Sequence, residues 1–228
     1  MNDLLLFPEN ISDPKVMAFF STKKGSEETH LLGIAAGIDW NNVYTPIQKH
    51  TNIVHILDSA RTPIIADAVV TNHFDLPIAI RTADCVQVVL FDPKRSVVGV
   101  VHAGWRGSAQ GILKKTLAVF MERFSSNPSD ILVSIGPSIC GTCYEVGPEV
   151  ADAVSKSTGA GDYVSKRENS IYVDLRAANR LQALSLGVIK DNVWIAEECT
   201  FCSADKYHSY RRTKGAPGRQ HAVIMLRS

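Results

Sequence analysis

The sequence Cys85-Val-Gln-Val-Val-Leu-Phe-Asp-Pro-Lys-Arg-Ser-Val-Val-Gly-Val-Val-His102 contains two apolar runs separated by a polar turn. The runs at 86–91 and 97–101 predict buried strands, and Asp92-Pro-Lys-Arg95 between them favours a hairpin. In such a hairpin Cys85 starts the first strand and His102 ends the second, so their side chains meet at one edge of the sheet. A thiolate beside an imidazole there is typical of a metal site or of a Cys/His nucleophile pair.

The sequence after His102 favours this chemistry over a structural role. His102 continues into Ala-Gly-Trp-Arg-Gly107, and a helix is predicted after Gly107. One face of this helix carries charged residues. The other face is an apolar stripe that consists of Ile112, Leu113, Leu117, Phe120, Met121 and Phe124. The structural alternative is a buried cysteine near a histidine bonded to the backbone.

The composition is that of an ordinary globular protein. The chain has 228 residues, of which 45% are hydrophobic and 21% charged, enough for a sizeable core. A net charge of +1, from 24 basic and 23 acidic residues, excludes the electropositive field of a general nucleic-acid binder. No segment approaches the roughly 18 apolar residues of a membrane span, and the amino terminus does not resemble a secretory signal. Five cysteines without an export signal predict reduced thiols in the cytoplasm.

The distribution of elements predicts one domain spanning residues 1–228. Asp174 is the N-cap of a second predicted helix, which stops near Gly187. Hairpins mixed with separated helices favour an α/β layered fold with a mixed β-sheet. The chain lacks G-x-G-x-x-G and G-x-x-x-x-G-K-[ST], which argues against a dinucleotide fold or a P-loop. Further predicted strands are residues 53–57, 78–80, 131–135, 193–196 and 222–226, and predicted loops are 23–30, 125–130 and 155–162.

Seven short motifs occur in an order that resembles a known family. They are Thr82-Ala-Asp-Cys85, His102-Ala-Gly-Trp-Arg-Gly107, Ile135-Gly-Pro-Ser138, Tyr144-Glu-Val-Gly147, Cys199-Thr200, Ser209-Tyr-Arg-Arg212 and Gly218-Arg-Gln220. From about residue 16 onward the chain closely resembles the multicopper polyphenol oxidoreductase (laccase-like) family, also called the purine nucleoside phosphorylase family with a laccase domain. The resemblance implies a single α/β domain related to the catalytic domain of cytotoxic necrotizing toxins.

The resemblance also implies an activity. It implies a zinc-dependent enzyme that cleaves adenosine, inosine, guanosine and S-methyl-5'-thioadenosine with phosphate, and that deaminates adenosine as a second activity. Purine nucleosides and phosphate are therefore the expected partners, whereas nucleic acid and membranes are not. The sequence leaves the oligomeric state open.

The resemblance supplies a third metal ligand. The family's Gln-x-His-Gly motif matches Gln48-Lys-His50-Thr51, with threonine in place of the glycine, so His50 is implied to join Cys85 and His102. His55, inside a predicted strand, is a weaker candidate. Two imidazoles and one thiolate leave the fourth tetrahedral position of zinc open for water or substrate. Zinc there would lower the pKa of a bound water toward roughly 7.

Other residues are candidates for proton transfer and for binding. Asp84 and Glu145 are the acid/base candidates, although strand alternation would turn Asp84 away from Cys85. Arg106, just before the predicted helix, is the candidate catalytic group for phosphate, because helix N-termini favour anions. Lys23 lies in Thr22-Lys-Lys-Gly25, which stands where the family has Thr-Arg-x-Gly-Gly. The candidates for binding substrate or phosphate are Lys23 and, through bidentate pairing, Arg211, Arg212 and Arg219.

Two C-x-x-C pairs provide a rival metal site. Cys140/Cys143 and Cys199/Cys202 would together make a four-thiolate zinc site, or singly a thioredoxin-like redox pair. The 55 residues between Cys143 and Cys199 far exceed the usual spacing of zinc ribbons, which disfavours the four-thiolate site.

Copper is the alternative occupant of the His/Cys site, because it outcompetes zinc in raw affinity. A copper-dependent polyphenol oxidoreductase (laccase) or a cell-wall-related enzyme is therefore an alternative function. Several copper centres would need many imidazoles, however, and the chain has seven histidines with no His-x-His pair. The non-enzymatic alternative is a metal-binding protein whose fourth ligand comes from the protein.

Overall fold

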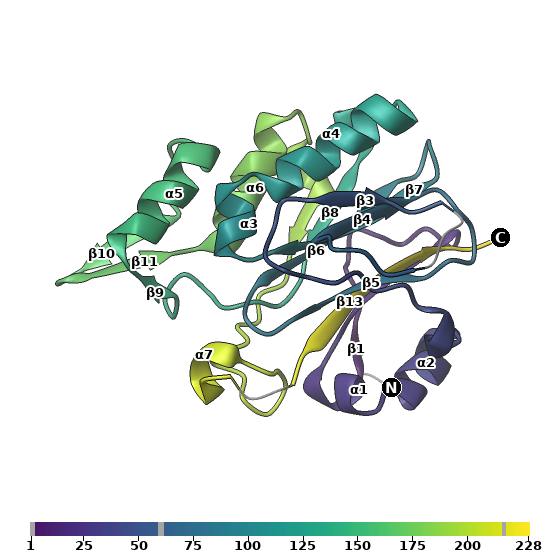
Figure 1. Cartoon of the computed structure of the whole chain (residues 1–228), viewed down its shortest axis with the longest axis horizontal. Helices are drawn as coiled ribbons and strands as arrows, with labels where there is room; N and C mark the ends of the chain where they lie inside the picture. Colours follow the sequence, from purple (N-terminus) through teal and green to yellow (C-terminus); the bar gives the residue numbers. More distant parts are fainter. Residues whose placement is uncertain (1–2, 59–61, 216–217) are drawn as a thin grey trace.

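The computed structural model, which describes residues 3–58, 62–215 and 218–228, has a mixed α/β fold with two principal sheets (Figure 1). In the larger sheet β3–β4 and β8–β12 are parallel and the other pairs antiparallel, so the predicted mixed sheet is confirmed. Its strands, in order, are β12 (Val193–Ile195), β8 (Leu132–Ile135), β6 (Val86–Asp92), β7 (Val97–Ala103), β4 (Ala68–Thr71) and β3 (Val54–Ile56). The four-stranded sheet consists of β1 (Leu5–Leu6), β2 (Val16–Ser21), β13 (Gln220–Leu226) and β5 (Ile78–Thr82). A small third sheet consists of β10 (Val164–Arg167), β11 (Ser170–Val173) and β9 (Glu145–Val146).

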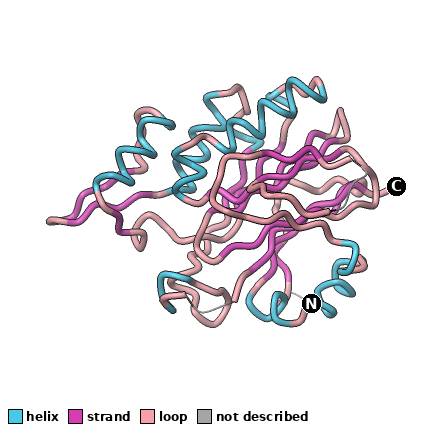
Figure 2. The backbone as a smooth tube through the Cα atoms, viewed as in Figure 1, coloured by secondary structure: helices cyan, strands magenta, loops and turns pink. Residues whose placement is uncertain are grey.

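Helices cover the outer faces of the two principal sheets, so that strands lie between two groups of helices (Figure 2). Over the larger sheet lie α3 (Trp105–Ala109), α4 (Ile112–Phe124) and α6 (Leu175–Ser185), whereas α5 (Pro148–Thr158) lies beside α3 and α6 over the small third sheet. Beside the smaller sheet lie α1 (Lys23–Glu27) and α2 (Thr29–Ala36), and α7 (Tyr210–Thr213) is a single turn. Short 3₁₀ turns are Trp40–Asn42, Pro128–Asp130 and Lys190–Asn192.

The core has three layers of buried side chains because both sheets are covered on both faces. Along β6, Val88 and Leu90 pack toward α4, whereas Val89 and Phe91 pack toward the four-stranded sheet. Along β2, Phe20 faces the same layer between the sheets, and Phe19 faces α2. Burial on both faces explains why the strands are continuous apolar runs without polar alternation.

The predicted hairpin is confirmed. Strands β6 and β7 pair antiparallel, with Val86 opposite Ala103 and Gln87 opposite His102. Cys85 comes directly before β6, and His102 is near the end of β7. Because the two strands are antiparallel, both residues lie at the same edge of the sheet. The five other predicted strands correspond to β3, β5, β8, β12 and β13, with ends that differ by a few residues.

The helix predicted after Gly107 is two helices. The first, α3, already begins at Trp105, and Gly111, in the left-handed region at φ +69°, separates it from α4. The apolar stripe nevertheless lies on the buried face of α4, where Ile112, Leu113, Leu117 and Phe120 are buried and Met121 and Phe124 are half-buried. The N-cap prediction is also confirmed, because the Asp174 carboxylate accepts hydrogen bonds from the backbone N–H groups of Arg176 and Ala177.

Several elements differ from the predictions or lie outside them. The loop predicted at 23–30 is wrong, because this segment forms α1 and the start of α2, with the Thr22 hydroxyl capping Gly25 N–H. The loop predicted at 155–162 is wrong in its first part, which is the last turn of α5. The buried strands β2 and β4 are not among the predicted strands. No helix among the described residues has both the length and the apolar character needed to cross a bilayer.

His221 on β13 is expected to make folding sensitive to mild acid. Its ring packs edge-on against Trp40, and burial, followed by the charges of Arg81 and His208, lowers its pKa to about 4. The unfolded chain takes up this proton near pH 6.5, whereas the folded chain does not, so stability falls as pH drops from 6.5 toward 4. The free energy of unfolding should fall by about 2 kcal/mol more in wild type than in His221→Gln between pH 7 and pH 5.

Urea unfolding of both proteins at the two pH values measures this difference. The exposed His30 provides the matched control, since His30→Gln should keep the full wild-type loss. An equal acid loss in wild type and His221→Gln would show that another group carries it.

Candidate functional site

The functional-site candidates gather around a cleft of about 690 Å³ at one edge of the larger sheet. Its floor holds Cys85 and His102, and His50 enters from the loop before β3. Three aromatic side chains line it, which are Trp105, Tyr144 and Tyr210. Four arginines also line it, which are Arg81, Arg106, Arg211 and Arg219.

His50, Cys85 and His102 converge from three separate segments. Their ligand atoms all lie within 4.8 Å of one another, and the two imidazole rings are 4.8 Å apart between centroids. His55, the weaker candidate, lies on β3, packs against the ring of Tyr44 and is outside this group. The structure thus brings together the three residues that the sequence analysis proposed as metal ligands.

A buried carboxylate, Asp67, orients two of the three. Its Oδ1 lies 2.7 Å from His102 Nδ1 and accepts a hydrogen bond from His50 N at 3.0 Å. Its Oδ2 accepts bonds from Thr51 N and Thr51 Oγ1, both at 2.7 Å, and from Lys49 N at 3.2 Å. An imidazole held through Nδ1 presents Nε2 to the cleft, which is the arrangement seen where a carboxylate supports a metal-binding histidine. No motif or local pattern in the sequence singles out Asp67.

The threonine that replaces the family's glycine fits this loop. Thr51 supplies two of the hydrogen bonds to Asp67, and its hydroxyl oxygen also accepts one from Ile53 N. His50 itself has φ +59°, in the left-handed region that non-glycine residues seldom adopt. The bonds to Asp67 hold His50 in that conformation.

Gly104 leaves the space that the three side chains surround. A Cβ at this position would lie 3.0 Å from Cys85 Sγ, 3.1 Å from His50 Cδ2 and 3.7 Å from His102 Nε2. The Cys85 contact is at the limit that real Cβ atoms avoid, so any side chain here would displace at least one of the three. The glycine after His102-Ala therefore leaves the three ligand side chains room that any larger residue would reduce.

The electrostatics of the trio favour a bound cation. Burial raises the pKa of Cys85, but the charge of His102 and hydrogen bonds from His102 and His50 outweigh it and lower this pKa to about 6. For His102, burial is outweighed by Cys85 and Asp67, which raise its pKa to about 9. Burial raises the pKa of Asp67 as well, but hydrogen bonds from His102 and Thr51 outweigh this effect and hold the pKa well below its usual range. Without a metal the site therefore contains a thiolate beside an imidazolium, and a divalent cation would displace the imidazolium proton.

The donor set fits a metal ion. Two imidazole nitrogens and one thiolate suit zinc and copper alike, and three protein ligands are the number found at catalytic metal sites that keep a fourth position open. A Cys/His nucleophile pair would consist of Cys85 and His102 alone. It would need neither His50 nor a glycine at position 104 that leaves room for three side chains. The residues that would hold the ion are thus His50, Cys85 and His102.

Asp84 lines the cleft, but its carboxylate is already engaged. It accepts hydrogen bonds from Thr200 Oγ1 at 2.6 Å, Ser209 Oγ at 3.0 Å and Arg211 N at 2.7 Å. The expectation that strand alternation turns Asp84 away from Cys85 is wrong, because β6 begins only at Val86 and Asp84 has φ +82°. Asp84 thereby joins the segment before β6 to the loop at Thr200 and to the start of α7.

The remaining candidates divide into two groups. Arg106, Arg211 and Arg219 line the cleft, with Arg106 4.3 Å over the Trp105 ring and Arg211 5.1 Å over the Tyr144 ring. Because α3 begins at Trp105, Arg106 lies inside the first turn of that helix and not before it.

Arg212, Glu145 and Lys23 are not among the lining residues. The Arg212 guanidinium donates to the carbonyls of Thr200, Phe201 and Tyr207, so it holds a loop together. The Glu145 carboxylate accepts from Ser170 Oγ at 2.6 Å on the third sheet. The Lys23 backbone N–H donates to Lys206 O at the start of α1.

Two lining residues add chemistry that the sequence analysis did not assign. Burial, followed by the charge of Cys85, raises the pKa of Tyr144 to about 12, so its phenol stays protonated at neutral pH. Gln48 accepts from Arg81 N and donates to Arg81 O, both at 2.8 Å, which fixes the strand edge beside His50. Tyr144 and Gln48 each lie in a motif of the family resemblance. These motifs were the sequence signal that could have identified both residues as part of the site.

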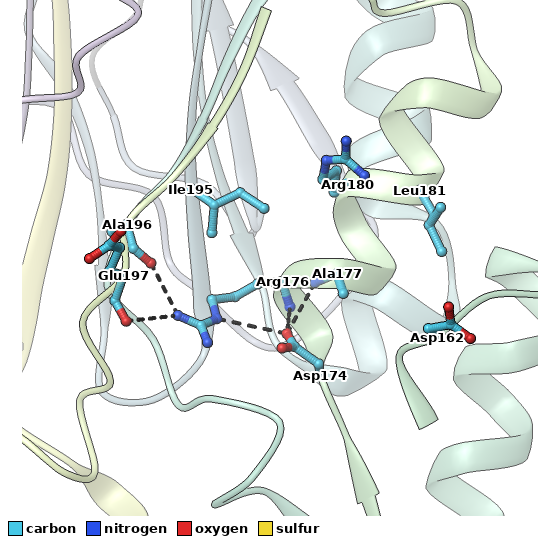
Figure 3. Close-up of a pocket in the computed structure, with 9 residues that line it drawn as sticks. All are labelled: Asp162, Asp174, Arg176, Ala177, Arg180, Leu181, Ile195, Ala196 and Glu197. Carbon is cyan, nitrogen blue, oxygen red and sulfur yellow. Dashed lines mark hydrogen bonds and ion pairs between the residues drawn. The ribbon is translucent and has the colours of Figure 1, made fainter. Parts of the chain in front are cut away.

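A second depression of about 580 Å³ lies beside α6 and carries no comparable group (Figure 3). Figure 3 shows the Arg176 guanidinium between Asp174 and the carbonyls of Ala196 and Glu197. These contacts tie α6 to the end of β12, so this depression is explained by packing.

Comparison with known proteins gives consistent matches. Residues 22–227 match the model of a family described as multi-copper polyphenol oxidoreductase laccase. A purine nucleoside phosphorylase of Deinococcus radiodurans is 41% identical over 160 residues, which cover 70% of this chain and 61% of that protein. Adenosine deaminase RL5, from an unknown prokaryotic organism, is 33% identical over 206 residues, covering 85% of this chain and 78% of that protein.

The fold is also shared with a solved structure. YlmD from Geobacillus stearothermophilus superposes with a TM-score of 0.88 at 27% identity, covering 94% of this chain and 93% of that chain. In sequence alignments the chain spans 59–61% of the length of three curated relatives, all named purine nucleoside phosphorylases.

Proposed function

Because the chain belongs to the multi-copper polyphenol oxidoreductase laccase family, we propose that it is a zinc-dependent purine nucleoside enzyme. Two of the similar proteins described above are named a purine nucleoside phosphorylase and an adenosine deaminase, which supports this proposal. Its main reaction is phosphorolysis of adenosine, inosine, guanosine and S-methyl-5'-thioadenosine to the free base and a ribose 1-phosphate or its methylthio form. Adenosine deamination is the second activity.

The observation that carries this proposal is the group formed by His50, Cys85 and His102, in which Asp67 holds the two histidines and Gly104 leaves space beside all three side chains. Three ligands leave one position of a tetrahedral ion open to the cleft. Zinc bound there would act as a Lewis acid toward a substrate oxygen or a water. A purely structural zinc would be enclosed by four protein ligands.

The walls of the cleft match the two halves of the substrates. The rings of Trp105, Tyr144 and Tyr210 offer faces and edges against which a purine can pack. The guanidinium groups of Arg106 and Arg211 can pair with phosphate oxygens. In phosphorolysis a phosphate oxygen bonds to ribose C1' as the bond from C1' to the base breaks, and the departing base gains a proton.

We assign separate roles to the polar groups of the cleft. The protonated Tyr144 phenol can donate a hydrogen bond to the substrate. Asp84 is a positioning residue, since its three hydrogen bonds place Arg211 and the loop at Thr200. Arg106 binds phosphate, and Arg219 contributes positive charge at the rim.

The copper oxidoreductase alternative finds less support in the site. Among the described residues, one cluster of potential metal ligands contains histidines, and it has two of them. A multi-copper centre would require several more imidazoles within reach. Oxidation of phenols by copper-loaded protein, with nucleosides left intact, would favour this alternative.

Product analysis tests the proposal. Incubation of adenosine with the protein and phosphate should yield adenine and ribose 1-phosphate, and without phosphate a slower formation of inosine. Arg106→Ala should lower phosphorolysis about 10-fold or more relative to deamination, because only phosphorolysis uses the anion that the guanidinium binds. Chromatography of the reaction mixtures measures both rates.

Arg180→Ala is the matched control, since Arg180 lies in the depression beside α6 and away from the cleft. It should leave both rates unchanged. Equal losses of the two reactions in Arg106→Ala would assign that side chain to nucleoside binding or to structure. Intact adenosine under all conditions would refute the proposed function.

A further inference from the structure

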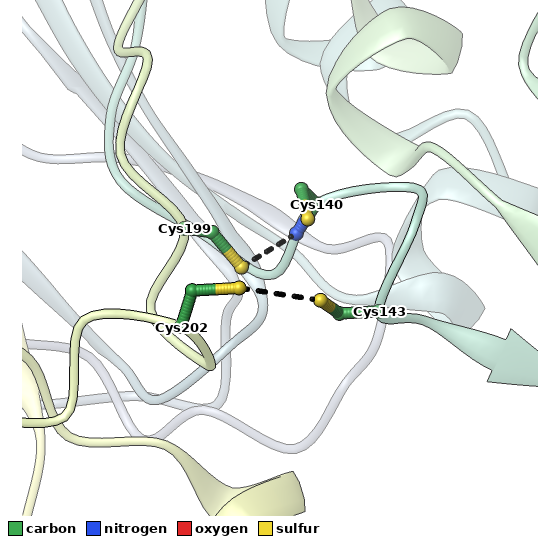
Figure 4. Close-up of side chains that lie close together, drawn as sticks. All are labelled: Cys140, Cys143, Cys199 and Cys202. Atoms are coloured by element: carbon green, nitrogen blue, oxygen red, sulfur yellow. Dashed lines mark hydrogen bonds between the residues drawn. The ribbon is translucent and has the colours of Figure 1, made fainter.

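Four cysteines outside the cleft form a second sulfur cluster (Figure 4). Cys140 and Cys143 lie in the loop between β8 and β9, and Cys199 and Cys202 lie in the loop that follows β12. Their Sγ atoms all lie within 4.8 Å of one another, and those of Cys143 and Cys202 are 3.4 Å apart. The 55-residue separation in sequence therefore does not keep the two pairs apart, because parallel pairing of β8 with β12 brings the two loops together.

The spacing of the sulfurs is that of a four-thiolate metal site. A zinc ion bound to four thiolates at about 2.3 Å places the sulfurs about 3.8 Å apart. Both C-x-x-C segments form turns closed by backbone hydrogen bonds, from Cys143 N to Cys140 O and from Ser203 N to Cys199 O, each 3.0 Å. Cys140 N also donates to Cys199 Sγ at 3.3 Å, which stabilises negative charge on that sulfur.

We propose that Cys140, Cys143, Cys199 and Cys202 bind a second zinc ion, separate from the cleft, that has a structural role. Four thiolates complete a tetrahedral shell, so this ion has no open position for substrate. Soft sulfur ligands without imidazole or carboxylate select zinc over magnesium or calcium. The inference does not depend on the proposed function, because the two ligand sets share no residue.

The ion would tie together a loop that lines the cleft and a second loop that supports the cleft residue Asp84. Tyr144, which lines the cleft, follows Cys143 directly, and Thr200, which donates to Asp84, follows Cys199. Arg212 binds the carbonyls of Thr200 and Phe201 inside the second C-x-x-C segment. Cross-linking residues that are 59 positions apart in sequence restricts the unfolded chain and holds these contacts in register.

Metal content is the first test. Protein purified under anaerobic, reducing conditions with Zn²⁺ supplied should contain about two zinc ions per chain, and Cys202→Ser and Cys143→Ser should each contain about one. Because Cys202 is exposed, its replacement leaves the core unchanged. Ala204→Ser, which places the same new residue on the same exposed loop, is the control and should retain both ions.

Spectroscopy and thermal unfolding identify which site is affected. Co²⁺-loaded wild type should show the intense visible bands of tetrahedral cobalt bound to four thiolates, and Cys202→Ser should lose them. The melting temperature of Cys202→Ser should fall by about 5 °C or more, with no change in Ala204→Ser.

The outcomes separate this inference from the proposed function. A single zinc that Cys85→Ala removes and Cys202→Ser retains overturns the second site and leaves the nucleoside proposal standing. Disulfides between the four cysteines in anaerobically prepared protein, detected by peptide mass spectrometry, also overturn it. A single zinc that Cys202→Ser removes and Cys85→Ala retains supports the second site and contradicts the metal-dependent function.

Discussion

Replacing Cys85 with alanine is expected to remove the zinc of the cleft and to lower both phosphorolysis and deamination by more than about 100-fold. Loss of a group that only supports a metal ligand typically costs 10- to 100-fold, so loss of a ligand should cost more. His102→Ala and His50→Gln should have the same result, because the remaining two ligands cannot hold the ion in an open tetrahedral geometry. Metal analysis and both rate measurements on the same preparations check this.

The control for the histidine variants is His73→Gln, since His73 is exposed and outside the cluster. It should keep the metal and both activities. Added Zn²⁺ should not restore Cys85→Ala. Full activity of Cys85→Ala would remove the thiolate from the ligand set, and loss of only one of the two reactions would mean that they do not share a metal.

Asp67→Asn is expected to weaken zinc binding in the cleft by about 10- to 100-fold and to lower the activity accordingly. The amide has one acceptor oxygen, whereas both carboxylate oxygens now accept, from the His50 loop and from His102. With its oxygen kept toward His102 and His50 N, the amide would turn its NH₂ toward the N–H groups of Lys49 and Thr51, so the residues on either side of His50 would lose the contacts that hold the loop. Saturating Zn²⁺ should recover much of the activity, which distinguishes this variant from Cys85→Ala.

Equilibrium competition with a coloured zinc chelator measures the affinity, and rates at several zinc concentrations measure the recovery. Asp152→Asn, on the exposed face of α5, is the matched control and should bind zinc as wild type does. If Asp67→Asn bound zinc normally and lost activity at every zinc concentration, Asp67 would act on the reaction and not on the ligands.

Local patterns in the sequence were sufficient to predict the centre of the molecule. The runs around Asp92-Pro-Lys-Arg95 predict β6 and β7, and this hairpin alone places Cys85 near His102. Periodicity likewise predicts α4, and the N-cap Asp174 predicts the start of α6. The position of His50 came from the resemblance to the family, because nothing in its local sequence distinguishes it from His55.

The parts that could not be predicted depend on contacts between distant segments. Asp67 precedes β4 as an ordinary polar residue, and its role arises only when the His50 loop and β7 pack on either side of it. The four-cysteine cluster depends on the pairing of β8 with β12, which sequence spacing does not reveal. Helix α1 has one buried residue, Gly25, so it carries no apolar stripe that periodicity could detect.

The place of β13 in the four-stranded sheet has a consequence for biosynthesis. Strand β13 follows every other helix and strand in the sequence, yet it lies between β2 and β5 and pairs with both. While the ribosome is still translating residues 220–226, β2 and β5 lack their shared partner, and Phe20, Ile78 and Ile80 lack the β13 side chains Ala222 and Ile224 that lie beside them in the layer between the sheets. A nascent chain that stalls before this point therefore exposes two strand edges and an apolar face, which makes it a substrate for chaperones and proteases.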